Sequence, residues 1–180
     1  NETDLMAISN ELNIPYSTTD LLDADFYLIC VKDAAIAEVS STIKKENCLV
    51  AHTSGSTSKE ILSGNYRKSI VYPLQTFSKS KNLNYSEIPF FLDAENEKDA
   101  QFLEKLTQKI SKKVLFADDE KRKHIHLTAV FACNFVNHLF ARAKELSDDQ
   151  NIPFNYFLPL IDETVAKIHE MDPKLAQTGP

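Results

Sequence analysis

The chain has 180 residues, of which 43% are hydrophobic and 26% are charged. Twenty Lys and Arg stand against 26 Asp and Glu, a formal net charge of -6, so a broad phosphate-binding surface and a nucleic-acid partner are not expected. No apolar run approaches the roughly 18 residues of a membrane span, so we expect a globular protein without a membrane partner.

The scarce residue types exclude several kinds of site. Cys30, Cys48 and Cys133 stand far apart among apolar neighbours, which favours reduced core thiols and a cytoplasmic location. Three scattered glycines leave no glycine-rich phosphate loop. His124 and His126 diverge on a helix and no metal is expected. Because the chain begins without methionine and ends without a closing element, we expect both ends to belong to a longer protein.

The first two thirds of the chain alternate between helical and strand patterns. Predicted helices cover residues 3–12, 34–45 and 97–110, and predicted strands cover 26–31, 48–52, 69–72, 89–92 and 114–116, with a short extended segment at 14–17. Asp33 is the expected cap of the second helix, and Thr57 with Glu60 has capping-box spacing. We expect the third helix to turn Phe102, Leu103, Leu106 and Ile110 inward. This alternation favours a largely parallel α/β sheet.

After Ala117 the strand patterns stop. One helix is predicted from Glu120 to about Leu146, and a second from about Pro153 to Met171, with Pro159 bending it or marking its true start. The sequence therefore predicts two domains, an α/β domain over 1–117 and an all-helical domain over 118–180.

Ligands of open parallel sheets bind beyond the carboxyl ends of the strands. That rule selects Val31–Asp33, His52–Ser56 and Tyr72–Thr76. The alternative is that Asp33 only caps a helix and the hydroxyl loop 53–58 is only a turn.

The long helix adds a polar stripe. On a 100° helical projection His126, Cys133 and Asn137 lie within about 40°, with Asn134 a further 60° round, among apolar residues. A buried imidazole or amide needs a partner, which is either a ligand or the protein's own backbone. On the last helix, Glu163 and Lys167 have the spacing of an ordinary surface ion pair.

Seven ordered segments, ADFYLICVKDAAIAEVS, HTSGS, YPLQTFSK, IPFFLDA, HLTAVFACNFVNHLF, PLIDETVAKI and QTGP, resemble one family. This family is the bacterial NADP-dependent oxidoreductases with an amino-terminal Rossmann-like domain and a carboxy-terminal helical domain of uncharacterised function. It is similar to ketopantoate reductase, pyrroline-carboxylate reductase and the beta-hydroxyacid dehydrogenases. The resemblance implies a Rossmann-like sheet, incomplete at its amino terminus, a dinucleotide site and a helical domain that forms a homodimer.

The chain departs from the family pattern in two places. First, the glycine-rich turn of the family should precede Asn1. Second, related dehydrogenases carry a Lys four residues before an Asn, whereas here Val130 precedes Asn134 and Cys133 precedes Asn137. His126, an imidazole suited to proton transfer, remains on that helix.

The resemblance implies hydride transfer between NADP, with NAD as the alternative, and a small carbonyl, hydroxy or imine substrate at the cleft between the domains. In this site His126 is assigned as the acid, and Asn134 or Asn137 orients the substrate oxygen. The residues assigned to the cofactor are Val31, Lys32, Asp33, His52, Thr53, Ser54 and Gly55. Those assigned to the substrate are Gln75, Thr76, Glu163, Thr164 and Lys167, with Gln177–Gly179 closing the pocket.

Two other functions compete with this one. The hydroxyl loop and the following helix terminus favour a non-catalytic module that binds a phosphosugar or another anion. Alternatively, the chain is a helical dimerisation protein on a vestigial nucleotide fold.

Overall fold

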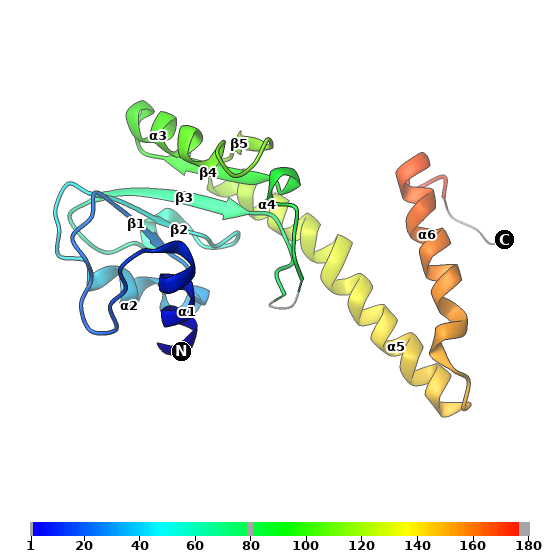
Figure 1. Ribbon diagram of the computed structural model, residues 1–180. Coiled ribbons are helices and arrows are strands. Elements are labelled where there is room, and N and C mark those ends of the chain that lie inside the picture. The colour runs from blue at the N-terminus through cyan, green and yellow to red at the C-terminus, as the bar shows by residue number, and fades with distance from the viewer. Residues whose placement is uncertain (1, 79–80, 177–180) are drawn as a thin grey trace. The chain divides into compact units, whose positions relative to one another are not determined.

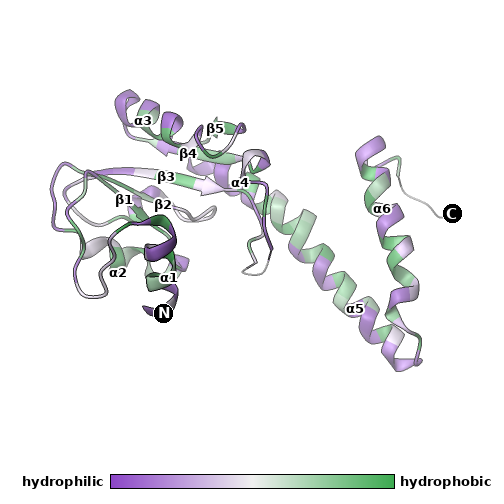
Figure 2. Ribbon diagram, in the orientation of Figure 1, coloured by the Kyte–Doolittle hydropathy of each residue, from purple (hydrophilic) through white to green (hydrophobic). Residues whose placement is uncertain are grey.

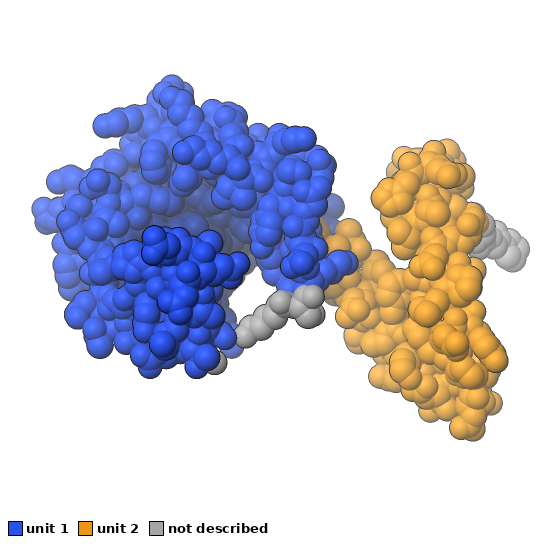
Figure 3. All heavy atoms as spheres, viewed as in Figure 1, with its two compact units in different colours: residues 1–128 blue, residues 129–180 orange. Residues whose placement is uncertain are grey.

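The computed structural model describes residues 2–78 and 81–176, and its internal contacts divide the chain into two compact units, 1–128 and 129–180 (Figures 1 and 3). The boundary predicted at residue 117 from the loss of strand patterns therefore lies eleven residues before the point where the contacts divide. The division into domains at residue 117 stays a prediction.

The first unit contains a five-stranded mixed sheet in the order β1-β2-β3-β4-β5. Its elements are α1 (Glu2–Leu12), β1 (Phe26–Ile29), α2 (Ile36–Ser41), β2 (Leu49–His52), β3 (Arg67–Pro73), β4 (Phe90–Ala94), α3 (Glu97–Thr107), β5 (Val114–Phe116) and α4 (Asp119–Ala129). The α/β fold is confirmed, and the pairs β1-β2, β2-β3 and β4-β5 are parallel.

β3 and β4 pair antiparallel, with Ser69 opposite Ala94 and Pro73 opposite Phe90. A parallel pair needs a crossover connection, usually a helix. Within the described residues between these strands, only the 3₁₀ turn Tyr85–Glu87 is helical. The chain therefore reverses direction between β3 and β4 rather than crossing over the sheet.

Three apolar clusters fill the two faces of the sheet. The first joins Ile29 and Val50 to Ile36 of α2, the second joins Leu92 to Leu103 of α3, and the third joins Tyr72 to Ala117 and Ile125 at α4. All four residues of β2 are buried, because this inner strand is covered on both faces.

Several local expectations need correction. Residues 14–17 form no strand, the second helix ends at Ser41 instead of residue 45, and the third at Thr107. Phe102 and Ile110 are 45% and 48% exposed, so of the residues expected inward only Leu103 is fully buried. Cys48 alone is a core thiol, since Cys30 and Cys133 are exposed.

The second unit is built from helices. It contains the π-helical segment Val130–Phe135, α5 (Val136–Asp149), the 3₁₀ turn Phe154–Phe157 and α6 (Leu158–Glu170). Pro159 lies in the first turn of α6, where the missing N–H costs no hydrogen bond, so of the two predicted effects it marks the start of the helix and does not bend it. Within residues 2–78 and 81–176, each helix falls short of the length and apolar character that a bilayer crossing requires.

Candidate functional site

The candidate site lies where β1, β2 and β3 end. These neighbouring strands are parallel, so their carboxyl ends reach the same edge of the sheet. Asp33 follows β1, the loop 53–58 follows β2, and Tyr72 is the penultimate residue of β3. The structure brings these three segments into direct contact, as the strand-end rule predicts.

His52 holds the loop from inside the protein. Its side chain is fully buried, Nδ1 accepts the backbone N–H of Ser54 at 3.1 Å, and Nε2 lies 3.3 Å from the carbonyl oxygen of Ser58. A backbone N–H can only donate, so Nε2 carries the proton and donates it to Ser58. Burial lowers the pKa of His52, and the charge of Arg122 lowers it further. His52 is thus a neutral support for the loop and has no surface for a ligand.

Asp33 organises the same loop from β1. Its Oδ2 accepts hydrogen bonds from the hydroxyls of Ser54 at 2.8 Å, Ser56 at 3.0 Å and Thr57 at 3.3 Å. Burial raises the pKa of this carboxyl, but the three hydroxyl hydrogen bonds outweigh burial and the pKa lies below its ordinary value. The expectation that Asp33 caps a helix is wrong: Lys32 occupies the cap position, and no side chain makes a capping bond there.

The capping-box expectation for Thr57 is also corrected, because the next residue does the capping. The side chain of Ser58 accepts the backbone N–H of Glu60 at the start of a 3₁₀ turn, Lys59–Ile61. Thr57 is drawn instead toward Asp33.

Gly55 packs against an aromatic pair. The Tyr72 hydroxyl lies 3.2 Å from Nδ1 of His126, and the two rings meet edge-on with centroids 6.1 Å apart. A Cβ on Gly55 would lie 2.5 Å from Cζ of Tyr72 and 2.8 Å from Nδ1 of His126. Only glycine lets the loop backbone approach this pair without displacing a ring.

Sequence reasoning missed Arg122, which is fully buried on α4 four residues before His126. Its Nη2 donates to the carbonyl of Thr57 at 2.7 Å and to Oδ1 of Asp119 at 2.5 Å, while Nη1 lies 3.8 Å from Oδ2 of Asp93. Nε and Nη1 have no hydrogen-bond partner among the described residues. The sequence feature that could have linked Arg122 to the site is its position four residues before His126, which places both residues on one helix face.

Arg122 and Lys59 meet the same carboxylate. Nζ of Lys59 lies 2.8 Å from Oδ2 of Asp93, and both side chains are mostly buried. This small charged cluster fixes the start of α4 against the end of the hydroxyl loop, and it thereby places His126 beside Gly55.

The predicted polar stripe is not a buried feature of the structure. Cys133, Asn134 and Asn137 are exposed, and they belong to the second unit. The π-helical segment Val130–Phe135 closes i→i+5 hydrogen bonds, so a 100° projection does not carry across it from His126 to Asn137. The roles of both asparagines in binding substrate stay predictions.

The expected substrate residues are mostly on the surface. Gln75 and Thr76 are exposed after β3, and Oε1 of Gln75 accepts the backbone N–H of Thr76. On α6, Nζ of Lys167 lies 3.7 Å from Oε1 of Glu163, the surface pair that the spacing allowed, and Thr164 donates to the carbonyl of Leu160. Gln177–Gly179 lie outside the described residues.

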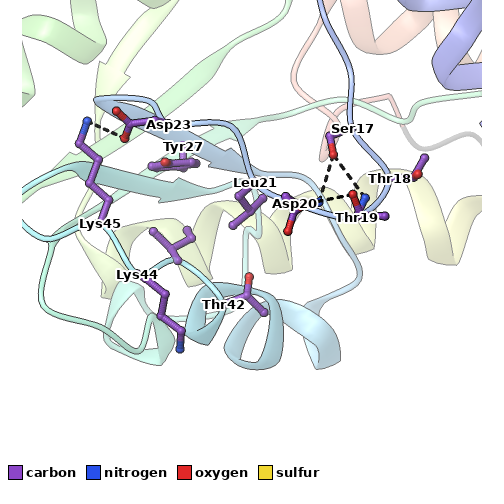
Figure 4. A pocket seen from close by; sticks show the side chains of 11 residues that line it. Ser17, Thr18, Thr19, Asp20, Leu21, Asp23, Tyr27, Thr42, Lys44 and Lys45 are labelled. Atoms are coloured by element: carbon purple, nitrogen blue, oxygen red, sulfur yellow. Dashed lines mark hydrogen bonds and ion pairs between the residues drawn. The ribbon is translucent and has the colours of Figure 1, made fainter.

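A polar pocket of about 550 Å³ lies at the other end of β1 and β2 (Figure 4). It is lined by Ser17, Thr18, Thr19, Asp20, Leu21, Asp23, Tyr27, Thr42, Ile43, Lys44 and Lys45. Lys45 is already paired with Asp23 and Asp25 at 3.0 Å each. The pocket shares no residue with the predicted site. Among the described residues, no three His, Cys, Asp or Glu gather as metal ligands.

The fold and this sheet edge define a Rossmann-like α/β protein with a helical carboxy-terminal region, and comparison with known proteins gives the family. Residues 88–180 match the model of a domain of unknown function, DUF2520. The chain also shares 41% identity with a protein of Bacteroides fragilis named "putative NADP oxidoreductase", over 100% of this chain and 72% of that one, with a TM-score of 0.85. The chain belongs to the DUF2520 family.

More distant solved structures share the fold. A Thermotoga maritima protein is 23% identical with a TM-score of 0.78, over 97% of this chain and 70% of that one. A semialdehyde dehydrogenase NAD-binding protein of Cupriavidus necator, solved with calcium and NAD, is 10% identical with a TM-score of 0.70, over 97% and 72%. A search of curated proteins found no significant match.

Proposed function

We propose that the protein is an oxidoreductase that transfers hydride between a nicotinamide dinucleotide and a small carbonyl, hydroxy or imine compound, with His126 as the proton donor. The observation that carries the proposal is the contact of His126 with Tyr72 and Gly55 at the edge where three parallel strands end. The name of the Bacteroides fragilis relative supports NADP as the cofactor. NAD is the alternative, and the Cupriavidus necator structure holds NAD on a similar fold.

The residues of this edge fit the nicotinamide end of such a cofactor. Val31 is 39% exposed and offers apolar surface two residues after the end of β1, and Lys32 is an exposed cation beside it. The neighbouring loop is held rigid by His52 and Asp33, so the surface is ordered before a ligand arrives. We therefore assign Val31 and Lys32 to ligand contact, and His52, Asp33 and Ser54 to support of the loop.

The bound nicotinamide would supply the hydride. As the carbonyl carbon gains that hydride, the carbonyl oxygen takes the proton from an N–H of protonated His126, which is left neutral, and the product is the alcohol. In the reverse direction neutral His126 accepts the hydroxyl proton. We also propose that either Asn134, on the π-helical segment that follows α4, or Asn137, on α5, orients the same oxygen.

The competing anion-binding function has less support. Its phosphate would need the hydroxyls of Ser54, Ser56 and Thr57, yet all three donate to one oxygen of Asp33. A phosphate in the same place would displace these bonds and stand beside a carboxylate whose lowered pKa keeps it charged.

We also propose that the second unit forms a homodimer. A groove of about 470 Å³ between α5 and α6 is lined almost entirely by apolar side chains, among them Leu139 and Leu160, which are 64% and 65% exposed. Apolar residues continue along both helices (Figure 2). A soluble protein rarely leaves such a surface in water, and a second copy, which presents the same surface, can cover it by twofold symmetry.

Thermal unfolding of the full-length protein with added dinucleotide tests the cofactor. If NADPH binds with a Kd of about 10 μM, 1 mM ligand should stabilise the protein by about 2.7 kcal/mol, which raises Tm by roughly 5–11 °C. Val31→Asp should abolish this shift, whereas Val165→Asp, at a similarly exposed valine on α6, should keep it. His126→Gln should keep the shift and lose turnover in a screen of aldehydes, 2-oxoacids and cyclic imines. Equal stabilisation by inorganic phosphate, or none by NADPH and NADH, would contradict the proposal.

A further inference from the structure

Tyr72 is the group of β3 that touches His126. The phenol ring is 9% exposed and lies between Phe91 of β4, at 6.3 Å between centroids, and the His126 ring, at 6.1 Å. The Tyr72 hydroxyl forms a hydrogen bond with Nδ1 of His126, at 3.2 Å. Tyr72 and His126 are 54 residues apart in the chain.

The direction of this hydrogen bond follows from the phenol. Burial raises the pKa of Tyr72, and nearby Asp33 raises it as well while Arg122 lowers it, so the hydroxyl keeps its proton at neutral pH. A phenol O–H is a strong donor, and an imidazole nitrogen without a proton is a strong acceptor. The pair is therefore best satisfied when Tyr72 donates to Nδ1. The single ring proton of neutral His126 then resides on Nε2.

Gly55 sets the distance between the two rings. A methyl group at this position would overlap both Cζ of Tyr72 and Nδ1 of His126, with separations of 2.5 and 2.8 Å. The loop backbone that His52 and Asp33 hold in place is thus in van der Waals contact with the pair. Any larger residue at this position would have to displace one of the two rings.

We propose that Tyr72 is a positioning residue that occupies Nδ1 of His126 and leaves Nε2 as the nitrogen that exchanges a proton with the substrate. This inference rests on the proposed function for its catalytic meaning, but the tautomer itself does not depend on turnover. With the neutral ring, Nε2–H is a donor that can polarise a carbonyl oxygen. With the protonated ring, the Tyr72 hydroxyl turns to accept from Nδ1–H, and Nε2–H is the bond that breaks during proton transfer. The substrate is then a compound whose carbonyl or hydroxyl oxygen, or imine nitrogen, exchanges its proton with Nε2.

Nitrogen-15 NMR of the histidine rings tests the proposal without a substrate. We would record two-bond ¹H–¹⁵N spectra of the 180-residue protein at about pH 8.5 and assign His126 by loss of its signals in His126→Gln. The expected wild-type pattern is an unprotonated Nδ1 and a protonated Nε2. In Tyr72→Phe the Nδ1 resonance should move, and the tautomer ratio should fall to that of free histidine measured under the same conditions.

Two further variants separate positioning from general structural damage. Gly55→Ala retains the hydroxyl but should disturb the His126 signals in the same direction as Tyr72→Phe, because the added methyl group pushes the rings apart. Tyr85→Phe, at a 50% exposed tyrosine, should leave them unchanged. A wild-type His126 protonated on Nδ1 would overturn the proposal, as would a Tyr72→Phe spectrum with an unaltered His126 pattern. If NADPH fails to bind while the tautomer is as expected, only the proposed function fails.

Discussion

Arg122→Ala should destabilise the first unit strongly, because it breaks a buried ion pair. The guanidinium is fully buried and bonds Asp119 at 2.5 Å and the Thr57 carbonyl at 2.7 Å. Removing one partner of a buried pair typically costs about 3–5 kcal/mol. Nε and Nη1 are buried without hydrogen-bond partners, and this already destabilises the wild-type protein. Removing the guanidinium also removes that cost. We therefore expect the lower end, about 3 kcal/mol, or roughly 6–12 °C in Tm.

Arg142→Ala is the matched control. Arg142 likewise pairs with an acid three residues away, Glu145, but both side chains are about 60% exposed. The loss should stay within about 0.5 kcal/mol. Arg122→Met, which keeps most of the volume, should recover part of the loss and thereby separate packing from pairing. Urea unfolding followed by circular dichroism gives the free energies. A cost of less than about 1 kcal/mol for Arg122→Ala, or one equal to that of Arg142→Ala, would refute the reasoning.

Two other predictions concern pH and assembly. Burial holds the pKa of His52 below 6.5, so the unfolded chain binds the proton more readily than the folded protein. The free energy of unfolding should therefore fall as pH drops below about 6.5, by up to about 1.4 kcal/mol per pH unit. His52→Gln should remove that contribution in urea unfolding at pH 5–7. An unchanged slope would show that His52 is not the group responsible. Leu160→Lys should weaken the dimer at least about a hundredfold, measured by light scattering with size exclusion, because a twofold-symmetric interface loses one leucine from each subunit. Leu175→Lys, which lies outside the groove, should leave the dimer affinity unchanged. A monomeric wild type, or an unaffected Leu160→Lys, would contradict the dimer.

The segment predictions held where local chemistry decides. A strand covered on both faces is mostly apolar, which is why residues 48–52 predicted β2. Pro159 can stand only where a helix begins or bends, and it begins α6. The contact between Asp33 and the loop 53–58 followed from parallel strands ending at one edge, although the capping role assigned to Asp33 was wrong.

Other features depended on contacts between residues distant in sequence. Periodicity reports which face of an element is apolar but not which neighbour it meets, so the antiparallel β4 and the pairing of Tyr72 with His126 could not be predicted. A helical projection also assumes one repeat, and the π-helical segment Val130–Phe135 breaks it between His126 and Asn137.

The sequence by itself determined the order of strands and helices and the edge at which polar groups gather, because short-range sterics and burial set both. The tertiary structure decided which of those groups face a ligand and which are structural. It buried Arg122 and His52 as supports and placed His126 against Tyr72 and Gly55. The physical reason is that the role of a polar group depends on its partners, and these partners come from other elements of the fold.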